Sequence, residues 1–129
     1  MVIDTSALVA ILFDEEDAES FEMAIERDPV RLISAASLLE TAMVVESRYG
    51  EAGGRELDLL LAKASIETVS VTEEQVEHAR RAFHRYGRGR GKAKLNFGDC
   101  FSYALAEVSG EPLLFKGRDF RRTDIPTAL

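Results

Sequence analysis

The sequence lacks the features that mark several large classes of protein. Its 129 residues include one cysteine, Cys100, which excludes an internal disulfide and a cysteine-rich zinc site within one chain. No apolar run approaches the roughly 20 residues that a membrane-spanning helix needs. No basic segment precedes the first apolar residues, so we expect no signal peptide and a cytoplasmic protein.

The glycines also lack the context of the common nucleotide-binding motifs. The glycine-rich residues 87–91 follow an expected helix, whereas Walker-type and dinucleotide-binding loops follow a strand. The composition, with 46% hydrophobic and 30% charged residues, is typical of a soluble globular protein. The length predicts a single domain over residues 1–129, long enough to bury a hydrophobic core.

The charged residues are distributed unevenly along the chain. Residues 1–79 contain eighteen acidic and five basic residues, a net charge of −13. Residues 80–129 contain five acidic and eleven basic residues, a net charge of +6, which brings the whole chain to −7. The overall charge argues against nucleic acid as a partner, but a basic region on an acidic protein indicates a local surface for a polyanion.

Asp4 is the only charged residue in the first thirteen positions. It follows apolar residues and precedes Thr5 and Ser6, which can cap a helix. We therefore expect a buried strand over residues 1–3, a turn at Asp4 and a helix that begins near Ser6. A carboxylate among apolar neighbours is unfavourable unless it is hydrated, paired or bound to a cation. Because no basic residue lies nearby in the sequence, we expect a metal ion at Asp4.

The hydrophobic pattern predicts strands that alternate with helices. Strands are expected at residues 1–3, 31–34, 66–71 and 113–115, with a short edge strand around Ile125. Helices are expected at residues 6–13, 14–27, 36–48, 56–64, 72–86 and 97–108. This order favours an α/β fold in which helices cover a four- or five-stranded parallel sheet. The expected buried faces of the last two helices consist of Val76, Ala79, Ala82 and Phe83, and of Phe97, Phe101, Leu105 and Val108.

Four acidic residues can meet at one rim of this sheet. Asp4 and Asp119 follow predicted strands, whereas Glu40 and Asp99 lie early in predicted helices. Strand ends and the first turns of crossover helices gather on one rim of a parallel sheet. Four carboxylates there would repel one another unless cations neutralise them, and oxygen-only sites suit Mg²⁺ or Mn²⁺. The pattern therefore predicts metal-assisted hydrolysis of a phosphodiester.

Other interpretations of the acids stay open at this point. Taken singly, Glu40 can be a half-exposed helix carboxylate, and Asp99 can be an acid favoured by a helix N-terminus. A receiver-type signalling module would need paired acids after the first strand. A haloacid-dehalogenase-type phosphatase would need an acid where this chain has Ser6. The alternative to an enzyme is a non-catalytic Mg²⁺-binding signalling or partner-binding α/β module.

Residues 87–94 form a basic loop that is interrupted by glycines. Such a loop can be a mobile surface connection, or it can contact phosphates, which Lys and Arg neutralise without reading sequence. The candidates for contact with an RNA backbone are Arg85, Arg88, Arg90, Lys92, Lys94, Lys116 and Arg118.

Four segments of the chain also resemble a known family. They are Asp4-Thr5-Ser6-Ala7, Leu38-Leu39-Glu40-Thr41-Ala42, residues 96–106 with Asn96 and Asp99, and residues 113–120 with Asp119. In this order and spacing they resemble the PIN domain, most closely that of the VapC toxins of VapBC toxin–antitoxin pairs. The resemblance covers the whole chain.

The resemblance implies a three-layer α/β/α fold and an Mg²⁺- or Mn²⁺-dependent endoribonuclease that acts as a toxin. By matching motif positions, it implies that Asp4, Glu40 and Asp99 are metal ligands. Asp119 would be the fourth acid and would act directly or through water. The resemblance also implies dimerisation and inhibition by a cognate VapB-type antitoxin.

The resemblance further implies supporting roles for three polar residues. Ser6 would hydrogen-bond within the metal site, whereas Thr5 and Asn96 are weaker candidates for positioning groups. One departure concerns Arg118, because relatives often carry an acidic or polar residue at that position. This basic residue puts a second metal site in doubt, so we expect one well-held ion and an optional second.

Overall fold

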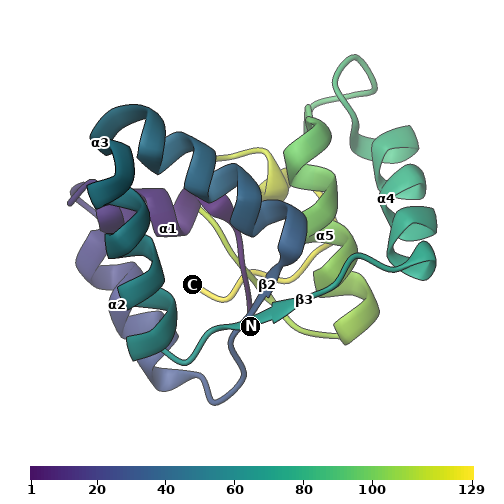
Figure 1. The fold of residues 1–129 in the computed structure, drawn as a ribbon. Helices are drawn as coiled ribbons and strands as arrows, with labels where there is room; N and C mark the ends of the chain where they lie inside the picture. The colour runs from purple at the N-terminus through teal and green to yellow at the C-terminus, as the bar shows by residue number, and fades with distance from the viewer.

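The computed structural model describes residues 1–129 as helices packed on both faces of a small parallel sheet (Figure 1). The sheet contains β1 (Val2–Ile3), β2 (Leu32–Ser34), β3 (Glu67–Val69) and β4 (Leu113–Leu114), in the order β3-β2-β1-β4. The helices are α1 (Thr5–Leu12), α2 (Ala18–Arg27), α3 (Ala35–Lys63), α4 (Glu73–Tyr86) and α5 (Phe97–Ser109), followed by the 3₁₀ helix η1 (Phe120–Arg122). This arrangement confirms the predicted three-layer α/β/α fold.

The alternation of side chains along the strands produces two hydrophobic cores. Ile3 and Leu114 face one core, which also contains Leu8 of α1 and Phe21 of α2. Val2 and Leu113 point the other way and pack with residues of α4 and α5. Because successive side chains of a strand point to opposite faces, two-residue strands are sufficient to serve both layers. The sheet is therefore buried on both faces, as parallel sheets usually are.

The sheet has four strands, so the additional edge strand expected around Ile125 is absent. Thr127 forms only an isolated parallel bridge with Leu113. The tail reaches the sheet there through the amide of Leu113, which donates to the carbonyl of Pro126. No helix of the chain is long and apolar enough to cross a membrane.

The helix after β1 begins one residue earlier than expected. Asp4 itself is the N-cap residue, because its carboxylate accepts a hydrogen bond from the amide of Ser6. The expectation that Thr5 or Ser6 caps this helix was therefore wrong. An aspartate can cap a helix through its side-chain oxygen, as serine and threonine do. Asp4, Thr5 and Ser6 are therefore all possible N-cap residues, and the sequence alone does not distinguish among them.

α3 joins two helices that the sequence analysis separated. The expected helices at 36–48 and 56–64 form one element that is interrupted at Gly50, whose φ of +63° and ψ of −152° are not helical. This combination of angles is essentially restricted to glycine. Gly50 thus marks the end of the first helical segment, two residues after the expected end at residue 48, but the chain re-enters a helix at once.

The buried faces of α4 and α5 differ from the expected ones. Phe97 is 81% exposed, and Val76 and Phe83 are also exposed. The side chains that α5 does bury include Cys100, Tyr103 and Leu105. The helical spacing of these apolar residues was predicted correctly. The apolar stripes of α4 and α5, however, extend beyond the core onto the surface, where they line a groove between the two helices.

Replacing Gly50 tests whether its conformation sets the kink in α3. We expect Gly50→Ala to lower the free energy of unfolding by about 1–3 kcal/mol, because alanine is strained at these angles. Gly54→Ala is the matched control, since Gly54 is helical and a methyl group there meets only the flexible side chain of Glu46. The control should be neutral or stabilising by up to about 1 kcal/mol. Urea denaturation of both variants measures this, and equal stabilities would contradict the assignment.

Candidate metal and nucleic-acid site

The carboxyl ends of β1 and β4 lie side by side and form the rim that carries the candidate site. Asp4 follows β1, and its amide donates to the carbonyl of Leu114 in β4 (2.9 Å). The amide of Lys116, two residues after β4, donates to Ser6 Oγ (2.9 Å). The two strand ends are thus tied together directly where the first acid stands.

Asp4 is 4% exposed, yet each oxygen of its carboxylate accepts at least one hydrogen bond. Oδ2 accepts from the amide of Ser6 (3.0 Å) and from Ser6 Oγ (2.7 Å). Oδ1 accepts from Ser102 Oγ of α5 (2.6 Å). These neutral donors replace the water that the carboxylate loses on burial, so the charge is stabilised without a basic side chain.

Glu40 lies in the second turn of α3 and packs against the backbone of α5. A Cβ atom built on Gly98 would stand 2.3 Å from Glu40 Oε2, which shows how closely the carboxylate approaches that backbone. Any side chain at position 98 would displace the carboxylate of Glu40, so glycine at this position allows the close contact. The contact places Glu40 next to Asp99, the following residue of the chain.

Asp99 lies in the first turn of α5 and completes a capping box with Asn96. The amide of Asp99 donates to Asn96 Oδ1 (2.9 Å), and Asp99 Oδ2 accepts from the amide of Asn96 (3.0 Å). The pKa of Asp99 is raised to about 6, chiefly by burial and also by the charges of Asp4, Asp119 and Glu40, whereas the hydrogen bond from the amide of Asn96 acts in the opposite direction. All three other acids are thus close enough to influence Asp99.

Asp119 is the most open of the four acids. It is exposed, and it precedes η1 without making a side-chain cap hydrogen bond. The chain between β4 and Asp119 turns at Gly117, whose φ is +107°. The carboxylate of Asp119 can therefore move more freely than that of Asp4.

The four carboxylates do not form a ready-made coordination shell. No group of three or more acidic, histidine or cysteine side chains stands close enough to hold a metal ion as the side chains lie. None of the four acids takes part in an ion pair with a basic side chain, since the basic partners in this region pair elsewhere. Mutually repelling carboxylates without a cationic partner, one of them buried, fit a divalent cation in their donor chemistry.

Of the three predicted supporting residues, two contact one of the four acids and the third does not. Ser6 contacts it directly, and Asn96 contacts Asp99. Thr5 is buried and donates to the carbonyl of Ser37 (3.0 Å), so it holds α1 to α3 and does not face the acids. Sequence reasoning missed Ser102, because a serine within an apolar helix carries no motif of its own.

The basic candidates lie on two surfaces. Arg88, Arg90, Lys92 and Lys94 are exposed in the loop between α4 and α5, seen at the top of Figure 1. Arg118 is exposed beside Arg121 and Arg122. Two candidates are engaged within the chain.

Arg85 lies over the ring of Tyr86 and pairs with Asp124. Lys116 Nζ contacts Glu15 (2.8 Å) and Asp17 (3.1 Å), and both carboxylates raise the pKa of Lys116. Because these two side chains already have acidic partners, they are less available to a phosphate than the loop residues.

A parallel sheet covered on both faces by helices, with acidic side chains at the carboxyl ends of its strands, is an architecture that metal-dependent nucleases share with other classes of α/β protein. The comparisons with known proteins specify the class. The chain belongs to the PIN-domain family, whose family model matches residues 1–126. Members of this family are metal-dependent nucleases.

Curated relatives are similar over nearly the whole chain. Ribonuclease VapC from Mycolicibacterium smegmatis is 66% identical over 125 residues, which cover 97% of this chain and 97% of that protein. Ribonuclease VapC30 from Mycobacterium tuberculosis is 62% identical over 127 residues, which cover 98% and 97%.

Solved structures share the fold at low sequence identity. The Mycobacterium tuberculosis VapC20 toxin, described as cleaving the sarcin–ricin loop, aligns with a TM-score of 0.78 and 19% identity over 96% of this chain and 95% of that one. A toxin–antitoxin complex from Klebsiella pneumoniae aligns with a TM-score of 0.71 and 19% identity, over 99% and 97%.

The raised pKa of Asp99 predicts a pH-dependent stability of the metal-free protein. The pKa is about 6 in the folded state and near 3.8 in the unfolded state, so the folded protein binds more protons between these values. Through this group, lowering the pH from 7 to 5 stabilises the fold. We expect Asp99→Asn to be more stable than the wild type at pH 7 by about 1–2 kcal/mol, after allowance for solvent screening. This difference should shrink by pH 5 in thermal unfolding with chelator, and a difference that stays constant with pH would refute the assignment.

Gly98→Ala tests the packing of Glu40 against α5. The new methyl group would occupy the place of Glu40 Oε2, so the carboxylate must move. We expect the affinity for Mn²⁺ to fall about 10- to 100-fold, the range for disturbed support of a metal ligand. The variant should unfold no more easily than the wild type, because alanine favours a helix over glycine. Calorimetric titration measures the binding, and wild-type affinity would contradict this role.

Proposed function

We propose that the protein is a Mg²⁺-dependent endoribonuclease, the toxin of a VapBC pair, in which Asp4, Glu40 and Asp99 hold the metal ion. The observation that supports this most directly is the buried carboxylate of Asp4, which has no basic partner, at the carboxyl end of β1, with Glu40 against the backbone of α5 beside Asp99. The charges of Asp4, Asp119 and Glu40 also contribute to the raised pKa of Asp99. The names of the full-length relatives support the ribonuclease activity. Oxygen-only donors favour Mg²⁺, with Mn²⁺ as a substitute.

The proposed reaction is hydrolysis of an RNA phosphodiester. Bound Mg²⁺ supplies Lewis acidity that stabilises negative charge on the phosphate and makes water a better nucleophile. Asp4, Glu40 and Asp99 orient the ion, while Ser6 holds the carboxylate of Asp4. Asp119, which is exposed and uncommitted, would ligate through water or accept the proton of the attacking water. One well-held ion, with an optional second, is consistent with the basic side chain of Arg118 beside Asp119.

The basic loop residues would hold the RNA backbone. Arg88, Arg90, Lys92 and Lys94 are exposed and carry no acidic partner, so their charges are available to phosphates. Arg85, Lys116 and Arg118 would add to this surface if RNA displaces the partners of the first two. Contacts of this kind position a strand without selecting its sequence.

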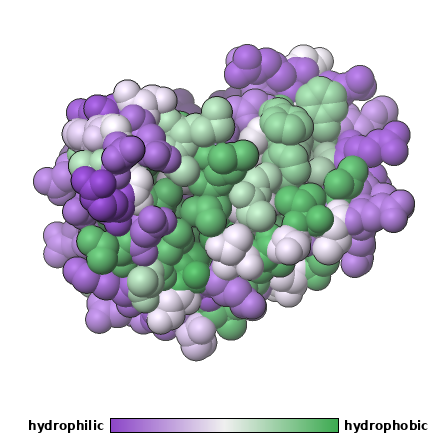
Figure 2. All heavy atoms as spheres, viewed as in Figure 1, coloured by the Kyte–Doolittle hydropathy of each residue, from purple (hydrophilic) through white to green (hydrophobic).

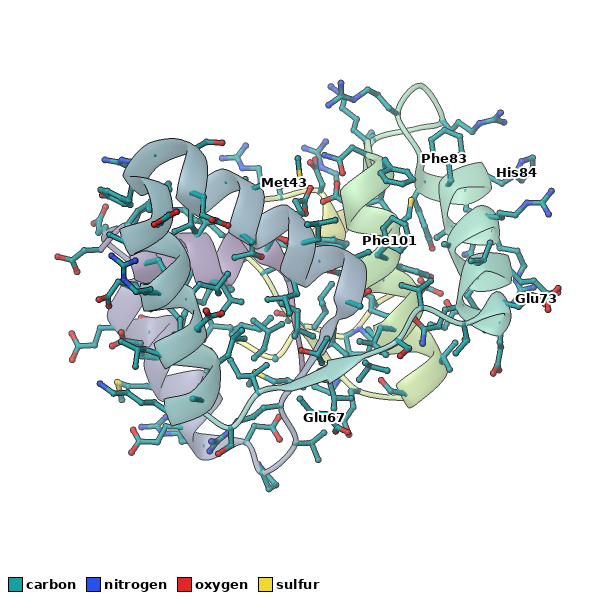
Figure 3. All side chains as sticks on the ribbon, in the orientation of Figure 1. Met43, Glu67, Glu73, Phe83, His84 and Phe101 are labelled. Atoms are coloured by element: carbon teal, nitrogen blue, oxygen red, sulfur yellow. The ribbon has the colours of Figure 1, made fainter.

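The protein partners would be a VapB-type antitoxin and a second copy of the chain. Exposed apolar side chains form a belt across α3, α5 and α4 that interrupts the hydrophilic surface (Figure 2). Met43, Phe101 and Phe83 mark this belt on the three helices (Figure 3). The groove between α4 and α5 has a volume of about 700 Å³ and includes Phe97. Patches of this kind favour a protein interface, which supports the proposed homodimer.

The remaining proposals concern organisation and place of action. The family model spans residues 1–126 without interruption, which supports a single domain over residues 1–129. A toxin that cuts cellular RNA would act in the cytoplasm, where its substrate and antitoxin are made.

Replacing Asp4 tests the proposed function. We expect Asp4→Asn to reduce metal-dependent RNA cleavage by about 100-fold or more, since loss of a ligand exceeds the usual effect of losing its support. Growth arrest on induction should disappear, while the circular dichroism spectrum stays that of the wild type. Asp14→Asn is the control, because Asp14 is exposed and its side chain makes no hydrogen bond or ion pair within the chain. An Asp4→Asn protein that still cleaves RNA and arrests growth would refute the proposal.

A further inference from the structure

Two buried serines to which the sequence analysis assigned no role lie beneath Asp4. Ser102 in α5 and Ser37 in the first turn of α3 are both inaccessible to solvent. Ser102 Oγ lies 2.6 Å from Asp4 Oδ1, and Ser37 Oγ lies 3.1 Å from Ser102 Oγ. The two hydroxyls form a chain that starts in α3, passes through α5 and ends on the carboxylate after β1.

The direction of this chain follows from the number of available protons. A carboxylate can only accept hydrogen bonds, and a serine hydroxyl has a single proton to donate. The proton of Ser102 is therefore used on Asp4, and Ser102 must accept from Ser37. Ser37 thus strengthens the bond from Ser102, because a hydroxyl that accepts a hydrogen bond is a better donor.

The two oxygens of Asp4 are not equally occupied. A carboxylate offers about four lone-pair sites, two on each oxygen. Both sites of Oδ2 are taken by the amide and the hydroxyl of Ser6. Oδ1 accepts only the hydroxyl of Ser102, so one lone pair of Oδ1 remains available.

We propose that Ser102, supported by Ser37, is a positioning residue that fixes the carboxylate of Asp4 so that the free lone pair of Oδ1 meets the divalent cation. This inference rests on the proposed function, in which Asp4 is a ligand. Ser6 contacts only Oδ2, so its two hydrogen bonds restrain Oδ1 only indirectly. The bond from Ser102 is the one that holds Oδ1 itself, and it restricts rotation of the carboxylate about the Cβ–Cγ bond more tightly than Ser6 does alone.

A neighbouring pair of hydroxyls provides a matched control. Thr41 in α3 is fully buried and donates to the carbonyl of Ser37 (2.7 Å), with its Oγ1 3.1 Å from Thr5 Oγ1. Thr41 has the same burial as Ser102 and lies in the same helix as Ser37, but its hydroxyl contacts Thr5 of α1 and does not contact Asp4. Thr41→Val removes this hydroxyl at nearly constant volume.

The experiment measures the binding of Mn²⁺ alone to RNA-free protein, by electron paramagnetic resonance of the free ion. We expect Ser102→Ala to raise the dissociation constant about tenfold or more, in the range for groups that support a metal ligand. Ser102→Cys keeps a weaker donor in a similar volume and should give an intermediate value. Ser37→Ala should give a smaller increase than Ser102→Ala. Thr41→Val should bind Mn²⁺ as the wild type does.

A second readout is the RNA cleavage rate as a function of Mn²⁺ concentration. The half-saturating concentration should rise in Ser102→Ala, while the rate at saturating Mn²⁺ stays close to that of the wild type. If Ser102→Ala does not fold, the same measurements on Ser102→Cys and Ser37→Ala test the inference.

Two results would overturn the inference. One is wild-type Mn²⁺ affinity in the Ser102 and Ser37 variants while Asp4→Asn has lost binding, which would leave the proposed function intact. The other is an equal loss of affinity in Thr41→Val, which would mean that removing any buried hydroxyl from the packing of α3 has the same effect. Wild-type Mn²⁺ binding by Asp4→Asn would instead refute the proposed function.

Discussion

The buried carboxylate of Asp4 is the group on which the arrangement of the rest of the rim depends. It caps α1, follows the inner strand β1 and accepts hydrogen bonds from two helices. Burying a charged group without a basic partner is possible only where polar donors replace its water. Ser6 and Ser102 supply those donors, and each accepts in turn from a neighbouring element, the loop after β4 and α3 respectively. The packing of the helices around β1 therefore also sets the orientation of Asp4.

The other acids have been brought together by backbone placement rather than by direct bonds. Glu40 reaches the rim because Gly98 leaves room for it, and Asp99 is held by its own helix cap. The proximity of four like charges is unfavourable in the metal-free protein, and together with burial, the larger cause, it raises the pKa of Asp99. Folding and hydrophobic packing offset this repulsion, and a bound cation would remove it.

Much of this arrangement could be predicted from the sequence, because strand ends and first helical turns have recognisable signals. Asp4 follows an apolar run, and Asn96 precedes a helix with Asp99 at the capping-box position, so their places at the rim were predictable. The exposure of Phe97 was not, because an apolar stripe has the same spacing whether it faces the core or a partner. The continuation of α3 beyond Gly50 and the contact of Ser102 with Asp4 depend on tertiary packing between distant segments. A single sequence carries no signal for such contacts.

Lys116 attaches the segment that carries Asp119 in two physically different ways. Its backbone amide holds Ser6, whereas its ammonium group bridges to Glu15 and Asp17 in the turn between α1 and α2. Exposed ion pairs are weakened by dissolved salt, but the backbone hydrogen bond is not subject to the same screening. Ionic strength therefore acts selectively on the outer attachment. The fourth acid would become more mobile in concentrated electrolyte while Asp4 keeps its orientation.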